Sequence, residues 1–336
     1  SWAVFAQGTF NLSDNLRVTL GLRYTEEEKE VQSDQFLSDT ITGIGEPSNS
    51  YFNAAVQAGE FNNYAYNYQD DRETDKWIPS VNVQWDVGAD TMLYASFSQG
   101  FKSGGFTSAD DGEPGGVVQG TLPCGPNPDL TVDIENCYDP SVPNDDFEFD
   151  DETVDAFEIG GKHTLLDGGM TLNWAAFYTV YDNLQTSIFK GVGFQVKNAA
   201  SSEVYGIELD ALWQATDNLR LGGNFAWLDA TYDDFKDGPC TAIQLDIDEF
   251  CGSPQGITSN DLSGEPTTYA SDYSAALFAD YVYPFSNSIE IFFGADMNYR
   301  DEFLSSGDND PLDLVEAYTK VNARVGVRGE QWEIMF

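Results

Sequence analysis

Alternation of apolar and polar residues over segments of about ten residues is the feature that most constrains this chain. Residues 16–24 read Leu-Arg-Val-Thr-Leu-Gly-Leu-Arg-Tyr, and residues 219–227 read Leu-Arg-Leu-Gly-Gly-Asn-Phe-Ala-Trp. Successive side chains of a strand point to opposite faces, so the apolar residues share one face and the arginines share the other. The pattern recurs along the chain, joined alternately by short turns and long acidic loops. This arrangement is typical of a transmembrane β-barrel.

The competing fold classes fit less well. None of the 336 residues belongs to an apolar run of about twenty residues, so helical membrane spans are excluded. A soluble β-sandwich also alternates, but its strands are usually shorter and lack a regular succession of short turns and long loops. The sequence therefore predicts an all-β fold, an antiparallel transmembrane β-barrel.

Turn residues between the apolar runs divide the chain into strands. Short turns are expected near residues 13–15, 88–90, 167–169, 216–218, 286–288 and 329–330. Twelve strands are predicted, near residues 2–12, 16–31, 76–87, 92–102, 152–166, 170–189, 194–213, 219–232, 268–284, 289–303, 315–328 and 331–336. Five outer loops complete the chain, at about 32–75, 103–151, 190–193, 233–267 and 304–314.

The period of two assigns the faces of these strands. Leu16, Val18, Leu20 and Leu22 are expected to face lipid, and aromatic residues near strand ends are expected to form interfacial girdles. Charged residues of both signs fall on the opposite face, which indicates a polar lumen, either wet or packed against another polar element. The predicted lumen residues are Arg17, Arg23, Glu158, Lys162, Glu208, Asp210, Arg220, Glu290, Asp296, Arg300 and Arg324.

The chain is strongly acidic, with 15 Lys and Arg against 57 Asp and Glu and a net charge of −42. Nucleic acid is therefore excluded as a partner, because phosphate contacts need basic patches. Clustered carboxylates permit a divalent cation in the acidic loops, with Asp145, Asp146, Asp150 and Asp151 as candidates, although no EF-hand spacing supports a site. A solvated, salt-tolerant acidic loop is the preferred explanation. No covalently bound cofactor is expected.

Four cysteines fall into two close pairs, each inside a long loop. Sequence proximity favours local disulfides between Cys124 and Cys137 and between Cys240 and Cys251, although three pairings are formally open. Zinc is the alternative, but there is no Cys-x-x-Cys motif and the single histidine lies in a predicted strand. An oxidising compartment follows. The chain begins in strand pattern without a signal peptide, so its N-terminus is expected to be processed or to lie outside this segment.

Motifs for chemistry are weak. The only histidine, His163, falls on the lipid-facing side of its strand, so no nucleophile has a base and no enzyme activity is expected. The glycines around Lys102 lack the Gly-Lys-Ser/Thr of a phosphate-binding loop. Tyr64, Tyr66 and Tyr68 alternate in the first outer loop, where they serve either ligand contact or loop packing.

Five segments resemble the barrel of TonB-dependent outer-membrane receptors. They are residues 5–25, 94–106, 152–162, 204–210 and 318–329, which together reach almost from end to end of the chain. The resemblance implies a 22-stranded barrel filled by an N-terminal plug. This sequence departs from that pattern, because it has about twelve strands, no plug and no TonB-contacting segment. We therefore expect a partial barrel over residues 1–336 that lacks the plug, the early strands and the last strands. A closed twelve-stranded barrel is the alternative, although the final strand is too short to span.

The resemblance also implies a function. It suggests energised import of a scarce nutrient across a Gram-negative outer membrane, most often a ferric siderophore, with cobalamin, oligosaccharide or another metal chelate behind it. TonB and its inner-membrane motor would act through the plug, which the lumen charges would hold. Membrane lipid and lipopolysaccharide would surround the barrel. The acidic loops argue weakly against a strongly anionic ligand, although local basic residues could override the net charge. A passive channel and a non-transport adhesin or scaffold remain as alternatives.

Overall fold

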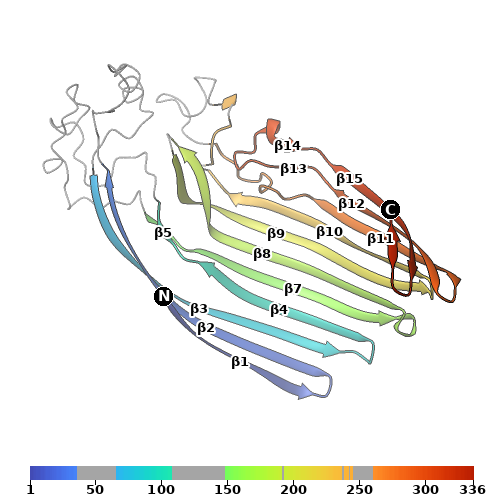
Figure 1. Ribbon diagram of the computed structural model, residues 1–336. Helices are drawn as coiled ribbons and strands as arrows, with labels where there is room; N and C mark the ends of the chain where they lie inside the picture. The colour runs from blue at the N-terminus through green and yellow to red at the C-terminus, as the bar shows by residue number, and fades with distance from the viewer. Residues whose placement is uncertain (36–65, 108–147, 191–192, 237, 242, 245–259) are drawn as a thin grey trace, which may run out of the picture.

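The computed structural model describes residues 1–35, 66–107, 148–190, 193–236, 238–241, 243–244 and 260–336. Twelve strands form one antiparallel sheet in which every neighbour in space is the next main strand along the chain, as Figure 1 shows. This confirms the predicted all-β fold. The strands are β1 (Trp2–Ser13), β2 (Leu16–Gln35), β3 (Tyr66–Asp86), β4 (Thr91–Lys102), β7 (Glu152–Leu165), β8 (Met170–Lys190), β9 (Gly193–Thr216), β10 (Leu219–Asp234), β11 (Tyr273–Ser286), β12 (Ile289–Arg300), β15 (Tyr318–Gly329) and β16 (Glu333–Met335).

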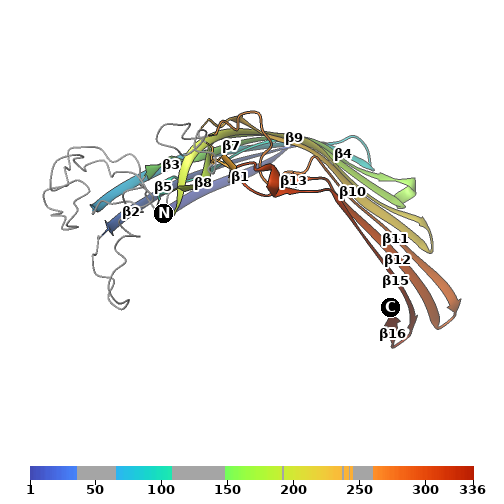
Figure 2. The same cartoon turned by 90° about the horizontal axis from the view of Figure 1, so that it is seen from above.

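The sheet is open and strongly curved. Strands β1 and β16 each pair with a single neighbour, so the described residues do not form a closed twelve-stranded barrel. Seen from above in Figure 2, the sheet bends around a hollow, which we call the concave face, and leaves a convex face outside. A wall segment of a wider barrel has this shape, because strand twist and stagger curve a sheet toward closure.

Short connections lie at one end of the sheet, at the positions predicted from turn residues. β1 and β2 are joined through residues 14 and 15, and β9 and β10 through residues 217 and 218. A single 3-10 turn, η2 (Leu166–Gly168), joins β7 to β8. Leu166, Asp167 and Gly168 all have positive φ there, and glycine meets that requirement without a Cβ clash. We call this end the turn end and the opposite one the outer end.

The hairpin of β2 and β3 extends beyond the strands predicted at residues 16–31 and 76–87. Its ladder continues without interruption from Leu16 and Trp85 to Gln35 and Tyr66, into residues that the sequence assigned to the first outer loop. Residues 26–30 read Glu-Glu-Glu-Lys-Glu and are polar on both faces of the strand. Where neither face meets lipid, alternation disappears although the backbone ladder persists. Likewise, β11 begins at Tyr273 and not at residue 268.

Two additional two-stranded sheets lie at the outer end of the described structure. β5 (Gly105–Phe106) pairs with β6 (Glu148–Phe149), and β13 (Phe303–Leu304) pairs with β14 (Leu314–Val315). A further 3-10 turn, η3 (Pro311–Asp313), is capped by the buried side chain of Asp310, which accepts the N–H of Leu312. The sequence predicted irregular loops here.

Few side chains are buried, and the apolar ones face outward. Within the described residues, a single buried apolar cluster joins Tyr232, Phe235 and Leu262 with Ala200 at the outer end. In contrast, Leu20, Ile159 and Leu277 on the sheet are 45%, 54% and 53% exposed. Among the described residues, no helix is long and apolar enough to cross a bilayer. The apolar surface of this protein is thus the outside of the sheet, as lipid requires.

Candidate functional site on the concave face

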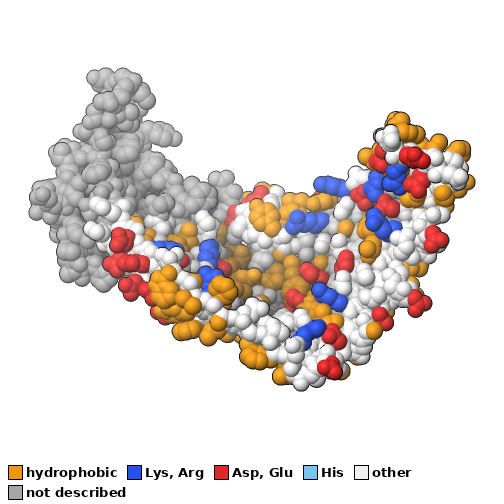
Figure 3. Space-filling model, turned by 60° about the horizontal axis from the view of Figure 1, so that its bottom comes forward, with side chains coloured by type: hydrophobic (Ala, Val, Ile, Leu, Met, Phe, Trp, Pro, Cys, Tyr) orange, Lys and Arg blue, Asp and Glu red, His pale blue; other side chains and the backbone are white. Residues whose placement is uncertain are grey.

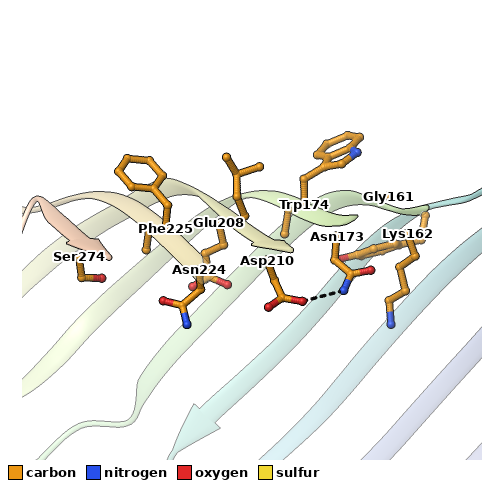
Figure 4. Close-up of a pocket in the computed structure, with 13 residues that line it drawn as sticks. Gly161, Lys162, Asn173, Trp174, Glu208, Asp210, Asn224, Phe225 and Ser274 are labelled. Atoms are coloured by element: carbon orange, nitrogen blue, oxygen red, sulfur yellow. Dashed lines mark hydrogen bonds between the residues drawn. The ribbon is translucent and has the colours of Figure 1, made fainter. Parts of the chain in front are cut away.

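All eleven residues predicted to face a lumen lie on one face of the sheet. The register places Lys162 opposite Asn173, Asn173 opposite Asp210, and Asp210 opposite Asn224. The same reading, continued in both directions, includes Arg17, Arg23, Glu158, Glu208, Arg220, Glu290, Asp296, Arg300 and Arg324. Figure 4 shows Lys162, Asn173, Glu208, Asp210 and Asn224 pointing to one side of the sheet, and Trp174 and Phe225 pointing to the other.

This polar face is the concave one. Figure 3 looks into the hollow of the sheet, where basic and acidic side chains gather among apolar ones. Twelve of the fifteen Lys and Arg residues project there by register: Arg17, Arg23, Lys29, Arg72, Lys76, Lys102, Lys162, Arg220, Arg300, Lys320, Arg324 and Arg328. The concave face therefore differs sharply from the rest of a chain whose net charge is −42.

Ion pairs cross the strands at the turn end. Asp280 accepts from Arg220 at 2.9 Å and from Arg324, and Arg324 also reaches Asp296 at 3.6 Å. Arg328 pairs with Glu290 at 2.8 Å. On the same face but near the β1 edge of the sheet, Arg17 pairs with Asp86 at 3.1 Å. These contacts are partly exposed, so each is worth little on its own. The pairs of Asp280 and Asp296 with Arg220 and Arg324 are connected into one network of alternating charge, whereas the other two pairs are separate.

The middle of the concave face is hydrogen-bonded and acidic. The hydroxyl of Tyr94 donates to Glu158 at 2.5 Å, and the amide of Asn173 donates to Asp210 at 3.0 Å. Glu208 and Asp210 are exposed on this face. Lys162 is the cation in this central region of the described sheet, and it forms no ion pair with a described acid. These exposed polar groups are available to form hydrogen bonds and ion pairs with a second polar surface.

A dense ion-pair cluster lies at the outer end of β3 and β7. Arg72, whose side chain is 14% exposed, contacts Glu148, Asp150 at 3.2 Å and Asp151 at 3.2 Å. Lys76 adds a second cation 3.3 Å from Asp151. We call Arg72, Lys76, Glu148, Asp150 and Asp151 the outer ion-pair cluster. It joins β3 to the segment that precedes β7.

Asp151 is the centre of this cluster. Its carboxylate accepts the N–H of Gly104 at 2.7 Å and the hydroxyl of Thr74 at 3.1 Å. Burial alone would raise the pKa of Asp151, but Gly104, Lys76, Thr74 and Arg72 all favour the ionised form and hold that pKa below its ordinary value of 3.8. The segment after β4 is thereby tied to the wall, because Lys29 also donates to Ser103 at 2.7 Å and to the carbonyl of Gly104 at 2.6 Å.

The lowered pKa gives a pH prediction. A depressed carboxyl pKa stabilises the fold above the unfolded value and loses that contribution as pH falls through the folded value. We expect the Gly104 amide resonance, followed by NMR, to titrate with a midpoint below 3.8. The Asp151→Asn variant should abolish this titration. A midpoint at or above 3.8 would contradict the assignment.

Three sets of predicted site residues lie partly outside the described residues. Tyr66 and Tyr68 lie in β3, but their side chains, like all of Tyr64, are outside the described residues. Cys124, Cys137 and Cys251 are also outside them, and Cys240 is not a free thiol, so the disulfide pairing stays a prediction.

The cation candidates are the third set. Asp145 and Asp146 fall outside the described residues, while Asp150 and Asp151 contact Arg72 as described above. In the described part of the chain, no group of three or more His, Cys, Asp or Glu side chains is placed to hold a metal ion. A divalent cation in the acidic loops therefore remains a prediction.

His163 has a structural environment. Its Nε2 lies 3.1 Å from Nε1 of Trp174, which donates, and its Nδ1 lies 3.2 Å from the hydroxyl of Thr91. Both partners lie beside it on the face opposite Lys162, near the turn end. The sequence placed His163 on this face, but it could not show the contact with Trp174.

Comparisons with known proteins agree with this geometry. Residues 1–335 match the family model described as TonB dependent receptor-like, beta-barrel. The metal-pseudopaline receptor CntO of Pseudomonas aeruginosa (strain UCBPP-PA14) is 30% identical over 109 residues, which are 32% of this chain and 15% of CntO.

Two solved structures share the fold. The ferric yersiniabactin uptake receptor FyuA from Yersinia pestis aligns with a TM-score of 0.61 at 14% identity, covering 96% of this chain and 37% of FyuA. The siderophore receptor PiuA from Acinetobacter baumannii aligns with a TM-score of 0.61 at 17% identity, covering 99% of this chain and 37% of PiuA. This chain thus spans little more than a third of those structures.

Proposed function

Since this chain belongs to the TonB-dependent receptor-like β-barrel family, we propose that it forms part of the wall of a receptor for TonB-dependent import of a metal chelate, with a ferric siderophore as the first candidate. The family consists of integral outer-membrane β-barrels, and this chain is a portion of such a barrel. The family and its solved members are transport receptors and not enzymes.

The observation that supports import is the contrast between the two faces of the sheet. The convex face exposes apolar side chains such as Leu20, Ile159 and Leu277, while the concave face presents exposed charged and amide groups. Outer-membrane transporter barrels of 22 strands, the size that the family resemblance implies, have a lumen that is filled by a plug. We infer that the concave face holds such a plug through polar contacts that can exchange while a ligand passes.

The ligand class follows from the relatives. FyuA and PiuA are siderophore receptors, and CntO is a receptor for a metal complex. FyuA and CntO support a chelated metal as cargo, PiuA supports a siderophore, and FyuA supports iron. TonB and its inner-membrane motor are the partners that energised import requires.

Uptake measured in cells tests the proposal. Cells that produce the whole protein should accumulate radioactive iron from a ferric siderophore, and accumulation should fall to background when a protonophore collapses the proton-motive force or when TonB is deleted. Unchanged accumulation after either treatment would point to a passive channel. A protein that binds no metal chelate but binds a surface partner would point to an adhesin.

A further inference from the structure

Two adjacent rows of side chains cross the concave face toward its outer end. The strands that build them are β9, β10, β11, β12 and β15, and the register sets each row. The first row is Glu208, Ala226, Ser274, Arg300 and Tyr318, and the second is Asp210, Asn224, Ala276, Asn298 and Lys320. Both rows have an acid at one end, small or neutral residues in the middle, and a cation toward the other end.

The small residues leave a recess beside the cations. This recess has a volume of about 650 Å³ and lies over β11, β12 and β15. Its lining contains Arg300 and Lys320 but no acidic residue. Ser274, Asn298, Asn322 and Tyr318 supply neutral polar groups around it. The volume is in the range of pockets that hold ligands of drug size.

Within the described residues, the contacts of Arg300 and Lys320 are all with neutral groups, and the nearest acid on this face, Asp296, accepts from Asn298 and Asn322 instead. Arg300 donates from Nε to the hydroxyl of Ser271 at 2.9 Å and from Nη2 to the carbonyl of Tyr269 at 2.8 Å, and its guanidinium lies over the ring of Phe303 at 4.1 Å. Lys320 lies over the ring of Tyr318 at 5.0 Å. Every one of these partners is neutral.

Other cations of the same face behave differently. Arg220, Arg324 and Arg328 each pair with an acid, whereas neither Arg300 nor Lys320 forms an ion pair with a described residue. Neutral contacts hold the Arg300 guanidinium in place without cancelling its charge. A fixed and unneutralised guanidinium beside an exposed ammonium is a favourable environment for carboxylate, catecholate or phosphate oxygens.

The acids at the far end of the rows add direction. Glu208 lies three strands from Arg300, a separation of roughly 14 Å at the usual spacing of neighbouring strands. Figure 4 shows Glu208, Asn224 and Ser274 on the same side of the sheet. An anion placed in the recess is therefore attracted by Arg300 on one side and repelled by Glu208 on the other.

We propose that Arg300 and Lys320 form an anion-binding subsite for the negatively charged oxygens of a metal chelate. The proposal rests on the proposed import function and gives it a ligand charge. It also reverses the expectation drawn from the acidic loops, because the concave face supplies local cations that the net charge of −42 conceals.

Binding of two ferric chelates to the purified whole protein tests this subsite. The probes are a ferric tris-catecholate, which is anionic, and a ferric trihydroxamate, which is neutral, each titrated calorimetrically at low and at physiological salt. The wild-type protein should bind the anionic chelate more tightly, and added salt should weaken that binding. The R300Q/K320Q variant should lose about tenfold or more in affinity for the anionic chelate, together with most of the salt dependence.

Two matched variants complete the experiment. Arg328→Gln removes a cation of the same face that is already paired with Glu290, so it should leave the affinity for the anionic chelate nearly unchanged. Glu208→Gln removes the repelling charge and should tighten binding about twofold, because an interaction over this distance is weak. A purely structural role for these side chains would not give opposite signs.

Either of two results would overturn the proposal. Wild-type protein that does not prefer the anionic chelate would exclude the subsite, and so would equal affinity of the wild-type and R300Q/K320Q proteins. Failure of the import proposal is seen separately, as uptake that survives loss of TonB. If uptake requires TonB while the double variant binds normally, only the subsite is wrong.

Discussion

Leu209→Arg is expected to prevent stable insertion of the sheet in the outer membrane. Leu209 lies in β9 on the face opposite Asp210, and its side chain is 41% exposed where lipid would cover it. An arginine on the lipid face near the bilayer midplane costs about 2–4 kcal/mol. The folded fraction, measured by heat-modifiable electrophoresis of outer-membrane extracts, should fall strongly.

The neighbouring residue supplies the control. Asp210→Arg introduces the same side chain one position along the strand, on the concave face, and there it costs only the hydrogen bond from Asn173. Insertion should remain near the wild-type level. Equal loss for Leu209→Arg and Asp210→Arg would show that the two faces of β9 are assigned wrongly.

Arg72→Met is expected to release the segments on either side of the outer ion-pair cluster. The arginine contacts three carboxylates, and Asp151 is only 12% exposed, so its loss leaves several negative charges facing one remaining cation, Lys76. Removing one partner of a largely buried pair costs about 3–5 kcal/mol in full burial, and we expect about 2–3 kcal/mol of local stability here. Hydrogen exchange of Gly104 and Gly105 should accelerate accordingly.

Arg17→Met is the matched control for this change. Arg17 pairs with Asp86 alone, and its side chain is 39% exposed, so its loss should cost about 1 kcal/mol or less and leave exchange at Gly104 unaltered. Arg72→Lys should resemble Arg72→Met, because a single ammonium cannot reproduce the forked contacts of a guanidinium. Unchanged exchange in Arg72→Met would show that the cluster does not hold this segment.

The sequence predicted the sheet well wherever a strand alternates between an apolar and a polar face. Period-two alternation placed Arg17, Lys162 and Arg324 on a common face because a slip of one residue would bury charge in hydrocarbon. At the outer end that constraint vanishes. The β2 and β3 ladder beyond Glu26 is polar on both faces, and the predicted strand ends were consequently too early.

Contacts between distant segments could not be predicted. Arg72 and Asp151 are 79 residues apart, and nothing in the local pattern of either indicates the other. The same holds for the charge state of the concave face. Sequence alone gave Arg300 and Arg324 identical roles, and only the register and the side-chain contacts show that Arg324 is paired with acids whereas Arg300 contacts neutral groups.

The inward placement of the basic residues has a consequence for protein chemistry at the cell surface. Reagents that attack amines, and proteases such as trypsin that cut after Lys and Arg, find their targets mainly inside the hollow. The three remaining basic residues, Lys190, Lys197 and Lys236, are all near the outer end. Outside the hollow and the apolar convex face, the reactive groups are therefore mainly carboxylates, and reagents that react with acids are the ones suited to mapping this protein on intact cells.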